Sequence, residues 1–194
     1  MAETFATGRP HLLGDITLRQ KRWSRTPINW TPINRNLPAA PRPQRIEEGI
    51  VERVADGDTL TVIMPNQTKL RIRMFRIDAP ETPKGTRFPG QPYGKEAEAY
   101  LNQLVEGKRV RVEIYQADRY KRLLSTIFLE GRDINLAMIE AGLAEGYRGP
   151  ESGNPYKPQY QAVENTARSA NKGMWGLGDQ YESPRAYRKR VGIR

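Results

Sequence analysis

Apolar and polar residues alternate through residues 49–65, GIVERVADGDTLTVIMP, on both sides of Gly57. A period of two is typical of strands with one buried face, and an Asp-Gly pair favours a tight turn between two strands. The segment therefore predicts a β-hairpin. A third strand is expected at residues 68–78, TKLRIRMFRID, although this segment carries three arginines and ends in a carboxylate.

After this region the apolar spacing changes to that of a helix. Residues 94–107 place Ala97, Tyr100, Leu101 and Leu104 on one helical face and end in a glycine, which favours a helix stop. The remaining expected elements are strands at 108–118 and 122–131 and helices at 133–144, capped by Asp133, and at 159–172. This order predicts a mainly β, α+β fold, a five-stranded OB-type barrel with three helices packed alongside.

The two ends of the chain differ in composition from this core. Residues 1–46 are rich in Pro, Arg and Asn and contain the echo TPINWTPIN, so they predict an extended N-terminal arm. A disordered tail and an arm that docks on a partner protein are both compatible with this composition. Residues 179–194 predict a basic C-terminal tail, in which residues 181–194 are expected to be mobile. The expected domain between the two spans residues 47–178.

The formal net charge of +10 favours a polyanionic partner, most commonly nucleic acid. A basic tail or a surplus of surface charge would give the same balance. The chain has no cysteine, and its single histidine, His11, lies in the predicted arm. Thiolate metal sites and histidine-based catalysis in the core domain are therefore excluded, and catalysis there would depend on carboxylates, Arg, Lys, Tyr or hydroxyl groups.

No segment contains the roughly 20 consecutive apolar residues that a membrane-spanning helix needs. The N-terminus also lacks the long apolar stretch of a secretory signal. These features predict an intracellular protein without a membrane partner, within a large assembly or an organelle, and leave the compartment open.

Two carboxylates are expected to meet at one end of the barrel. Asp58 opens the second expected strand and Asp78 closes the third, and neighbouring antiparallel strands place the start of one beside the end of the other. Two hard oxygen ligands favour Ca²⁺ or Mg²⁺ over zinc or copper. Ordinary turn chemistry would also account for Asp56 and Asp58 on either side of Gly57.

An arginine among the apolar residues of a strand needs a partner, because burying an unpaired guanidinium is costly. A phosphate group is one such partner for Arg73, and an ion pair with Asp78 or Glu81 is another. Arg122, just before the fifth expected strand, could equally be a surface charge. Arg71 and Arg76 are interpreted as ordinary surface or structural charges.

Five stretches together resemble the staphylococcal nuclease (thermonuclease) family: VADGDTLTV, IRMFRIDAPE, YGKEAEAYL, DRYKRLLSTIFLEGRDINLAMIEAGLA and GMWG. They lie between about residues 50 and 176, in the order of the elements expected above. The resemblance implies an OB-type barrel with three helices and Ca²⁺-dependent cleavage of phosphodiester bonds in DNA and RNA.

The resemblance also implies roles for the charged residues. Asp58, Asp78 and the backbone carbonyl of Ala79 would hold one Ca²⁺ ion, and Glu81 would act as the general base on the attacking water. Ala79 stands where the best-known member of the family has Thr, so the carbonyl is kept and a hydroxyl is lost.

Two arginines, Arg73 and Arg122, would bind the phosphate and stabilise the transition state by the same resemblance. Four further residues would support the site or line the nucleotide pocket: Asp56, Arg119, Tyr120 and Tyr147. The loop after Tyr147 and the segment ETPKGTRFPGQPYG depart from the family's pattern, which leaves contacts in these loops open.

The leading prediction is therefore a metal-dependent endonuclease of low specificity. Stacking tyrosines favour single-stranded or frayed nucleic acid over intact duplex. The alternative is a nuclease-like subunit of a larger assembly, docked by residues 1–46 and acting as a structural or nucleic-acid-binding component. The sequence does not decide between DNA and RNA.

Overall fold

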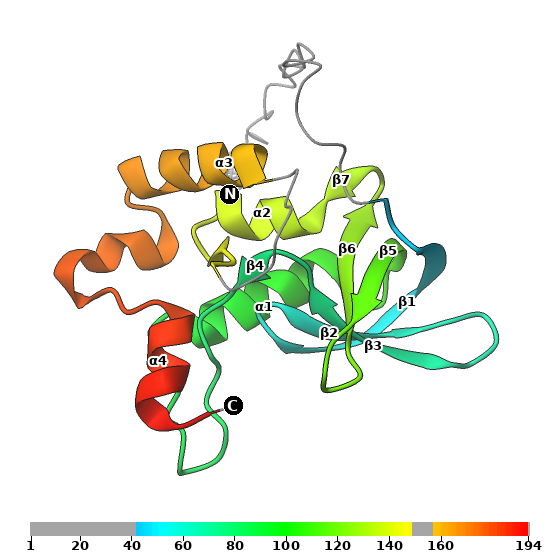
Figure 1. Ribbon diagram of the computed structural model, residues 1–194, viewed down its shortest axis with the longest axis horizontal. Helices are drawn as coiled ribbons and strands as arrows, with labels where there is room; N and C mark the ends of the chain where they lie inside the picture. Colours follow the sequence, from blue (N-terminus) through cyan, green and yellow to red (C-terminus); the bar gives the residue numbers. More distant parts are fainter. Residues whose placement is uncertain (1–41, 149–156, 194) are drawn as a thin grey trace, which may run out of the picture. The chain divides into compact units, whose positions relative to one another are not determined.

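The computed structural model describes residues 42–148 and 157–193 (Figure 1). Most of the predicted arm, residues 1–46, and most of the loop after Tyr147 lie outside the described residues, so the predictions made for them stay predictions. The first described strand begins at Arg45, inside the segment that was predicted as the end of the arm.

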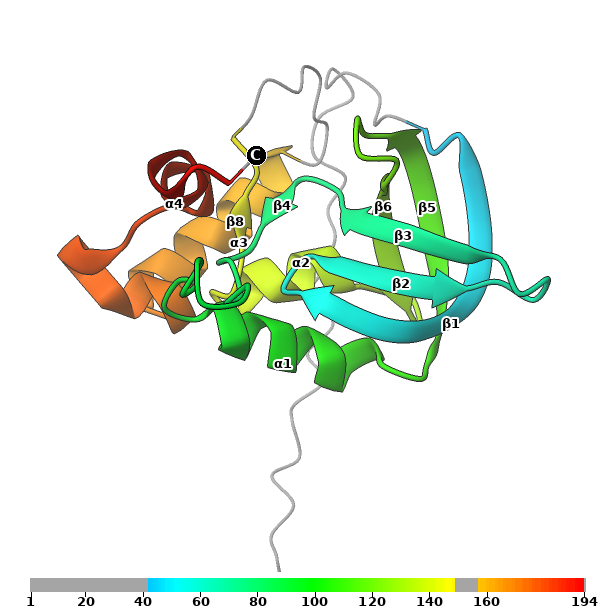
Figure 2. The ribbon, with the colours of Figure 1, turned by 90° about the horizontal axis from the view of Figure 1, so that it is seen from below.

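A closed five-stranded barrel forms the body of the described region (Figure 2). Its strands are β1 (Arg45–Asp56), β2 (Thr59–Ile63), β3 (Lys69–Met74), β5 (Arg109–Ala117) and β6 (Leu123–Leu129). They pair antiparallel in the order β3-β2-β1-β5-β6, and a parallel pairing of β3 with β6 closes the barrel. A short strand, β7 (Arg132–Asp133), pairs with the end of β6. The predicted OB-type barrel is therefore confirmed.

The third predicted strand is interrupted. β3 ends at Met74, and Arg76 adopts the left-handed backbone conformation with a φ of 67°. The chain then forms β4 (Ile77–Asp78), which pairs with β8 (Glu145–Gly146) in a separate two-stranded sheet. The prediction of one continuous strand over residues 68–78 was wrong, because a left-handed residue ends the alternation of side chains between two faces.

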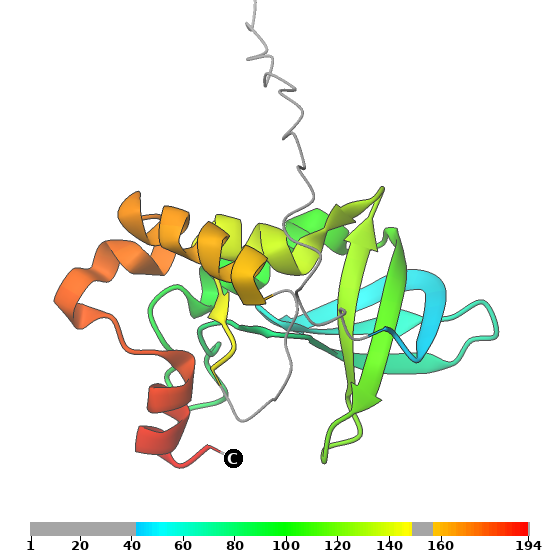
Figure 3. The ribbon, with the colours of Figure 1, turned by 45° about the horizontal axis from the view of Figure 1, so that its top comes forward.

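Three helices follow the positions predicted from the apolar spacing. They are α1 (Gly94–Val105), α2 (Ile134–Glu140) and α3 (Lys157–Ser169). Figure 3 shows α3 lying along α2. The side chain of Asp133 caps α2 by accepting a hydrogen bond from the backbone N–H of Leu136 at 2.9 Å, as its sequence position predicts. No helix in residues 42–148 or 157–193 is long and apolar enough to cross a membrane.

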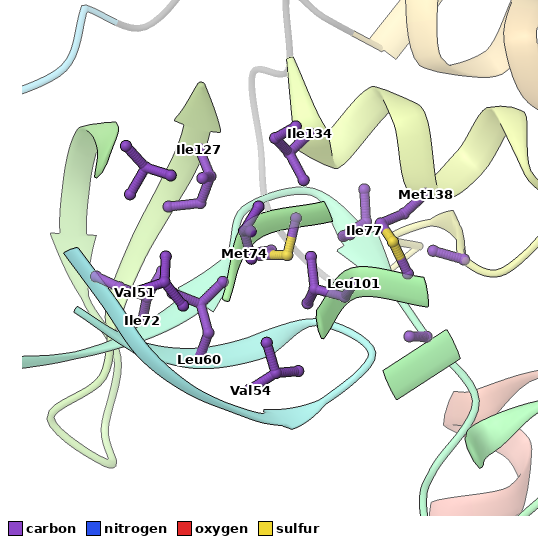
Figure 4. Close-up of a cluster of buried hydrophobic side chains, with 14 of the residues drawn as sticks. Val51, Val54, Leu60, Ile72, Met74, Ile77, Leu101, Ile127, Ile134 and Met138 are labelled. Atoms are coloured by element: carbon purple, nitrogen blue, oxygen red, sulfur yellow. The ribbon is translucent and has the colours of Figure 1, made fainter. Parts of the chain in front are cut away.

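Side chains from the strands, α1 and α2 share one apolar core (Figure 4). Leu60, Ile72 and Met74 come from β2 and β3, and they meet Leu101 of α1 and Met138 of α2; each is at most 1% exposed. Full burial of a side chain of this size contributes about 1.5–3 kcal/mol. The core thereby fixes the strand ends from which the charged residues project.

The chain after α3 is also folded. It forms the 3₁₀ helix η1 (Gly173–Gln180) and the helix α4 (Pro184–Val191), and Figure 1 shows α4 beside the loop that links β4 to α1. Gln91 of that loop donates from Nε2 to the backbone oxygen of Glu182 at 2.9 Å, and Tyr187 of α4 is only 3% exposed. The segment predicted as a basic tail, residues 179–194, therefore contains the helix α4, which the Ser183 cap and the buried Tyr187 support.

Candidate active site

A tight turn between β1 and β2 places two carboxylates at one end of the barrel. Its residues are Asp56, Gly57 and Asp58. Gly57 has no room for a side chain, because a Cβ there would lie 2.7 Å from the Cβ of Ala97 on α1 and 2.8 Å from the Cβ of Ala79. The glycine lets the turn pack directly against α1, and Asp58 is left only 1% exposed.

Arg73 joins the two carboxylates that were expected to meet. Thr59, next to Asp58, pairs with Arg73 in the ladder of β2 and β3. The Arg73 guanidinium forms an ion pair with Asp58 and donates from Nη2 to Asp78 Oδ1 at 2.6 Å. Asp58 Oδ2 accepts a further hydrogen bond from the backbone N–H of Ala79 at 2.8 Å. The two buried carboxylates therefore share the guanidinium of Arg73 at the end of the barrel.

Glu81 lies in the loop after β4 and is fixed by the start of α1. A Cβ at Gly94 would overlap the backbone oxygen of Glu81, so only glycine allows the helix to approach this closely. The carboxylate accepts from Lys84 Nζ at 2.6 Å and from Arg188 Nη1 at 2.8 Å. Burial alone would raise the pKa of Glu81, but hydrogen bonds from these two cations bring it below its usual value.

The pKa of Asp56 is shifted in the opposite direction, above its usual value. Burial and the negative charge of Glu81 raise the pKa of Asp56, and the nearby Lys84 only partly opposes them. Lys84 Nζ lies 3.3 Å from Asp56 Oδ2, so it links the two acids. Burial would lower the pKa of Lys84, but its bonds to Glu81 and Asp56 raise it, which keeps the amine charged.

A cleft of about 820 Å³ opens beside these carboxylates. Its wall carries seven basic side chains: Arg71, Arg73, Arg76, Lys84, Arg119, Arg122 and Arg188. Only two lining side chains, Glu81 and Asp118, are acidic. Among the described residues the cleft is therefore strongly cationic, which suits an anionic ligand.

Arg122 lines this cleft and is held by its own loop. It donates to Asp118 Oδ2 from Nε at 2.8 Å and from Nη2 at 2.7 Å. Partial burial would raise the pKa of Asp118, but the hydrogen bonds from Arg122 lower it. The same loop presents Tyr120, 44% exposed, with Arg119 and Arg122 stacked over its ring at 4.8 and 5.4 Å. Arg73, in contrast, contacts the buried carboxylate pair.

Tyr147 lines the cleft from the end of β8. Its backbone N–H donates to the backbone oxygen of Arg76 at 2.8 Å. The Arg76 guanidinium lies 4.1 Å from the ring centroid of Phe75, and that ring stacks on Tyr115 at 4.6 Å. Arg76 is only 7% exposed, so it is a structural charge in the wall of the cleft rather than a surface charge.

Three charged residues of this region were missed from the sequence. Lys84 was not singled out, although it lies only three residues after Glu81 in the same loop. Asp118 lies four residues before Arg122, a spacing that favours an ion pair. Arg188 belongs to the segment interpreted as a tail, where Ser183 and a following proline are helix-start signals.

The ligand atoms that Asp58 and Asp78 themselves offer are carboxylate oxygens, which fit Ca²⁺ or Mg²⁺ rather than a thiophilic metal. In the part of the chain that the structure describes, no three His, Cys, Asp or Glu side chains gather closely enough to hold a metal ion. A cation on this carboxylate pair would therefore need water or phosphate oxygens to complete its coordination, as hard cations commonly do. The guanidinium groups of Arg73 and Arg188 supply the positive charge between the carboxylates.

The fold and the site together define a small OB-type barrel domain with a carboxylate–arginine cluster under a basic cleft. The chain belongs to the staphylococcal nuclease homologue family, whose sequence profile matches residues 71–176. This match extends over β3 to η1 and includes Arg73, Asp78, Glu81 and Arg122.

Curated relatives from fungi are similar over most of the chain. The probable endonuclease lcl3 of Botryotinia fuckeliana is 34% identical over 176 residues, which is 74% of this chain and 65% of the relative. The probable endonuclease lcl3 of Sclerotinia sclerotiorum is 38% identical over 138 residues, 66% of this chain and 50% of the relative. The chain thus spans less than two thirds of the length of these relatives.

Proposed function

We propose that this chain is a Ca²⁺-dependent nuclease of low specificity that hydrolyses phosphodiester bonds of DNA, RNA or both. One observation carries the proposal: the buried pair Asp58 and Asp78, joined by Arg73, lies beside a cleft lined by Glu81 and Arg122. Family membership and the names of the fungal relatives support the same reaction class.

Asp58, Asp78 and the backbone carbonyl of Ala79 would hold the cation. When bound, a hard divalent cation supplies a Lewis acid for a phosphoryl oxygen and lowers the pKa of a coordinated water. The chain's own contribution is rigidity. The Ala79 N–H and Arg73 fix the Asp58 carboxylate, and Arg73 also orients Asp78.

Glu81 would accept the proton of the attacking water, a task that requires an ionised carboxylate. Its lowered pKa keeps it ionised at neutral pH. Arg73 and Arg122 would donate hydrogen bonds to the phosphoryl oxygens, which strengthen as negative charge accumulates in the transition state. Asp118 holds the Arg122 guanidinium on the cleft wall before substrate arrives, so less ordering is needed on binding.

The cleft would bind nucleic acid through phosphate contacts and base stacking. Phosphate contacts carry no sequence information, which gives low specificity. Tyr120 is exposed at the cleft and Tyr147 lines it, and stacking of a base on an aromatic ring contributes about 1–3 kcal/mol per base. Because only unpaired bases offer a free face, we propose a preference for single-stranded or frayed substrates.

A cleavage assay tests this function. The protein would be incubated with single-stranded and double-stranded DNA and RNA in Ca²⁺, in Mg²⁺ or in a chelator, and the products resolved by size. We expect cleavage with Ca²⁺, faster on single strands, and none with chelator. The variant Asp78→Asn should lose the Ca²⁺-dependent activity because it removes one charged ligand.

Two results would contradict the proposal. Cleavage that persists undiminished in chelator would exclude the metal-dependent mechanism. Binding of nucleic acid without cleavage under every condition would favour the alternative function, a binding or structural subunit docked by residues 1–46.

A further inference from the structure

Helix α4 brings an arginine into the candidate active site from the far end of the chain. Arg188 Nη1 donates to Asp78 Oδ1 at 2.9 Å, and its Nη2 donates to Asp78 Oδ2 at 2.7 Å. Nη1 also donates to Glu81 Oε1 at 2.8 Å. One guanidinium thus binds both the candidate metal ligand and the candidate base.

This contact is supported by the way α4 is seated. Ser183 caps the helix by accepting from the backbone N–H of Ala186 at 3.2 Å, and Tyr187, next to Arg188, is 3% exposed. The Arg188 side chain itself is 22% exposed, so it is reached by solvent from the cleft that it lines. The helix therefore holds the guanidinium against the carboxylates, and the side chain can still move from them into the open cleft.

The carboxylate oxygens at the site are already engaged. Both oxygens of Asp78 accept from Arg188, and Oδ1 also accepts from Arg73. Glu81 accepts from Arg188 on one oxygen and from Lys84 on the other. A divalent cation that uses Asp78 as a ligand must take over oxygens that carry charge-assisted hydrogen bonds, and these are among the strongest in proteins.

We propose that Arg188 is a positioning residue that competes with the divalent cation for Asp78, so that α4 sets the affinity of the site for metal. With the guanidinium docked, its charge balances that of Asp78, and Oε1 of Glu81 is occupied by a hydrogen bond. Release of the Arg188 guanidinium would free both oxygens of Asp78 from Arg188 and would free Oε1 of Glu81, whose Oε2 stays bound to Lys84. This inference rests on the proposed metal-dependent function, which it deepens by naming what the metal must displace.

The competition has a quantitative consequence. When a site is free in only a fraction of the molecules, its apparent dissociation constant is the intrinsic one divided by that fraction. If the docked form makes up about 90% of the cation-free protein, removal of Arg188 should tighten Ca²⁺ binding about tenfold.

Calorimetric titration of the full chain with Ca²⁺ tests this directly, without any measurement of cleavage. The test variant is Arg188→Gln, and the matched control is Arg190→Gln on the same helix. Arg190 is exposed and pairs with Glu182 outside the cleft, so its removal changes the net charge of the protein equally. A third variant, Asp78→Asn, reports whether the titrated site is the proposed one.

Amide hydrogen exchange of α4 provides a second readout, which a simple change in net charge would not move. We expect Ca²⁺ to speed exchange in residues 184–191 of the unmodified chain, because the helix loses its anchor on Asp78 and Glu81. In Arg188→Gln this anchor is already absent, and Ca²⁺ should leave the exchange of α4 unchanged.

The outcomes separate this inference from the proposed function. Tighter Ca²⁺ binding in Arg188→Gln but not in Arg190→Gln, with faster exchange of α4 on Ca²⁺ addition, supports the competition. Equal affinity in all three chains that keep Asp78, with binding lost only in Asp78→Asn, overturns the competition but leaves the metal site in place. Absence of Ca²⁺ binding in every chain, Arg188→Gln included, overturns both.

Discussion

Glu81 is held from two sides by cations that come from different parts of the chain. Lys84 follows it in the same loop, and Arg188 arrives on α4. The two contacts lower the pKa of the carboxylate, so it is ionised but its lone pairs are engaged. A general base needs a free lone pair directed at water. If Glu81 is the general base proposed above, it must first be released from one of these hydrogen bonds.

The substitution Glu81→Gln tests the role of this carboxylate. Gln has the same shape and accepts one of the two hydrogen bonds, but it does not take up a proton. We expect the single-turnover rate of cleavage to fall by about 10²–10⁴-fold, the usual contribution of general base catalysis. Rapid-quench assays with a labelled oligonucleotide would measure it.

A matched control is Glu130→Gln, at an exposed turn between β6 and β7. It removes the same charge away from the cleft and should cleave at the parent rate. If both variants cleave at the parent rate while remaining folded, Glu81 is not the base.

The charged residues near one another on neighbouring strands were accessible to sequence reasoning. Asp58 directly precedes β2 and Asp78 follows the paired strand β3, so strand order alone predicted that these two carboxylates lie near each other. The contact of Arg73 with Asp58 was not predicted. Arg188 could not be placed in this way, since 110 residues separate it from Asp78 and nothing local relates the two. Its partner is chosen by tertiary packing, which the pattern of one segment does not contain.

At the level of elements, the interruption between β3 and β4 was invisible in the sequence. Left-handed residues are most often Gly, Asn or Asp, and the residue here is Arg76. The apolar positions on both sides also continue the strand pattern. One long-range contact accompanies the break: the Arg76 backbone oxygen accepts from the backbone N–H of Tyr147, just after β8. This hydrogen bond helps to stabilise the left-handed backbone conformation of Arg76, which a residue other than glycine disfavours.

The cap of α2 offers a prediction about stability. Asp133 accepts from the backbone N–H of Leu136 and, on its other oxygen, from the hydroxyl of Tyr160 at 3.0 Å. Asp133→Ala should lower the free energy of unfolding by about 1 kcal/mol, the usual value of an N-cap. Asp133→Asn keeps an acceptor for the cap and should cost much less. Thermal or urea unfolding at neutral pH would measure both.

The pKa of Asp133 predicts how its contribution to stability changes with pH. Burial raises the pKa of Asp133 above its value in the unfolded chain, although the bonds from Leu136 and Tyr160 partly oppose it. The folded chain therefore binds the proton more tightly, and Asp133 favours folding more as the pH falls toward this raised pKa. The melting temperature of the parent relative to Asp133→Asn should rise as the pH is lowered from neutral toward 3.8, the ordinary pKa of an aspartate.

An exposed carboxylate provides the control for this titration. Asp179→Asn removes an exposed carboxylate from η1 and serves as the charge-matched comparison. A difference between parent and Asp133→Asn that stays constant with pH would contradict the raised pKa.

Across the whole molecule, the net charge of +10 pointed to a polyanionic partner but not to a place for it. Composition does not show where charges gather, because that depends on how distant segments fold together. The structure concentrates basic side chains from β3, the β5–β6 loop and α4 around one cleft. The role of residues 1–46 stays a prediction, since most of that segment lies outside the described residues.

If this cleft is the binding surface, its arginines should set the salt dependence of binding to nucleic acid. Each phosphate neutralised on a single strand contributes about 0.7 to the slope of the logarithm of the binding constant against the logarithm of salt concentration. Arg119→Ala removes an exposed cleft arginine and should weaken binding while lowering that slope by about 0.7. Arg132→Ala removes the same charge from a pair with Glu140 outside the cleft and should leave the slope unchanged.

Fluorescence anisotropy with a labelled single strand in chelator measures this binding without hydrolysis. Equal changes of slope in the two variants would mean that the strand follows the overall charge of the protein rather than the cleft. A loss confined to Arg119→Ala would place a phosphate beside Tyr120, on the same wall as Arg122. The scissile bond would then lie between that wall and the side chains of Arg73 and Glu81, since all of these line the same cleft.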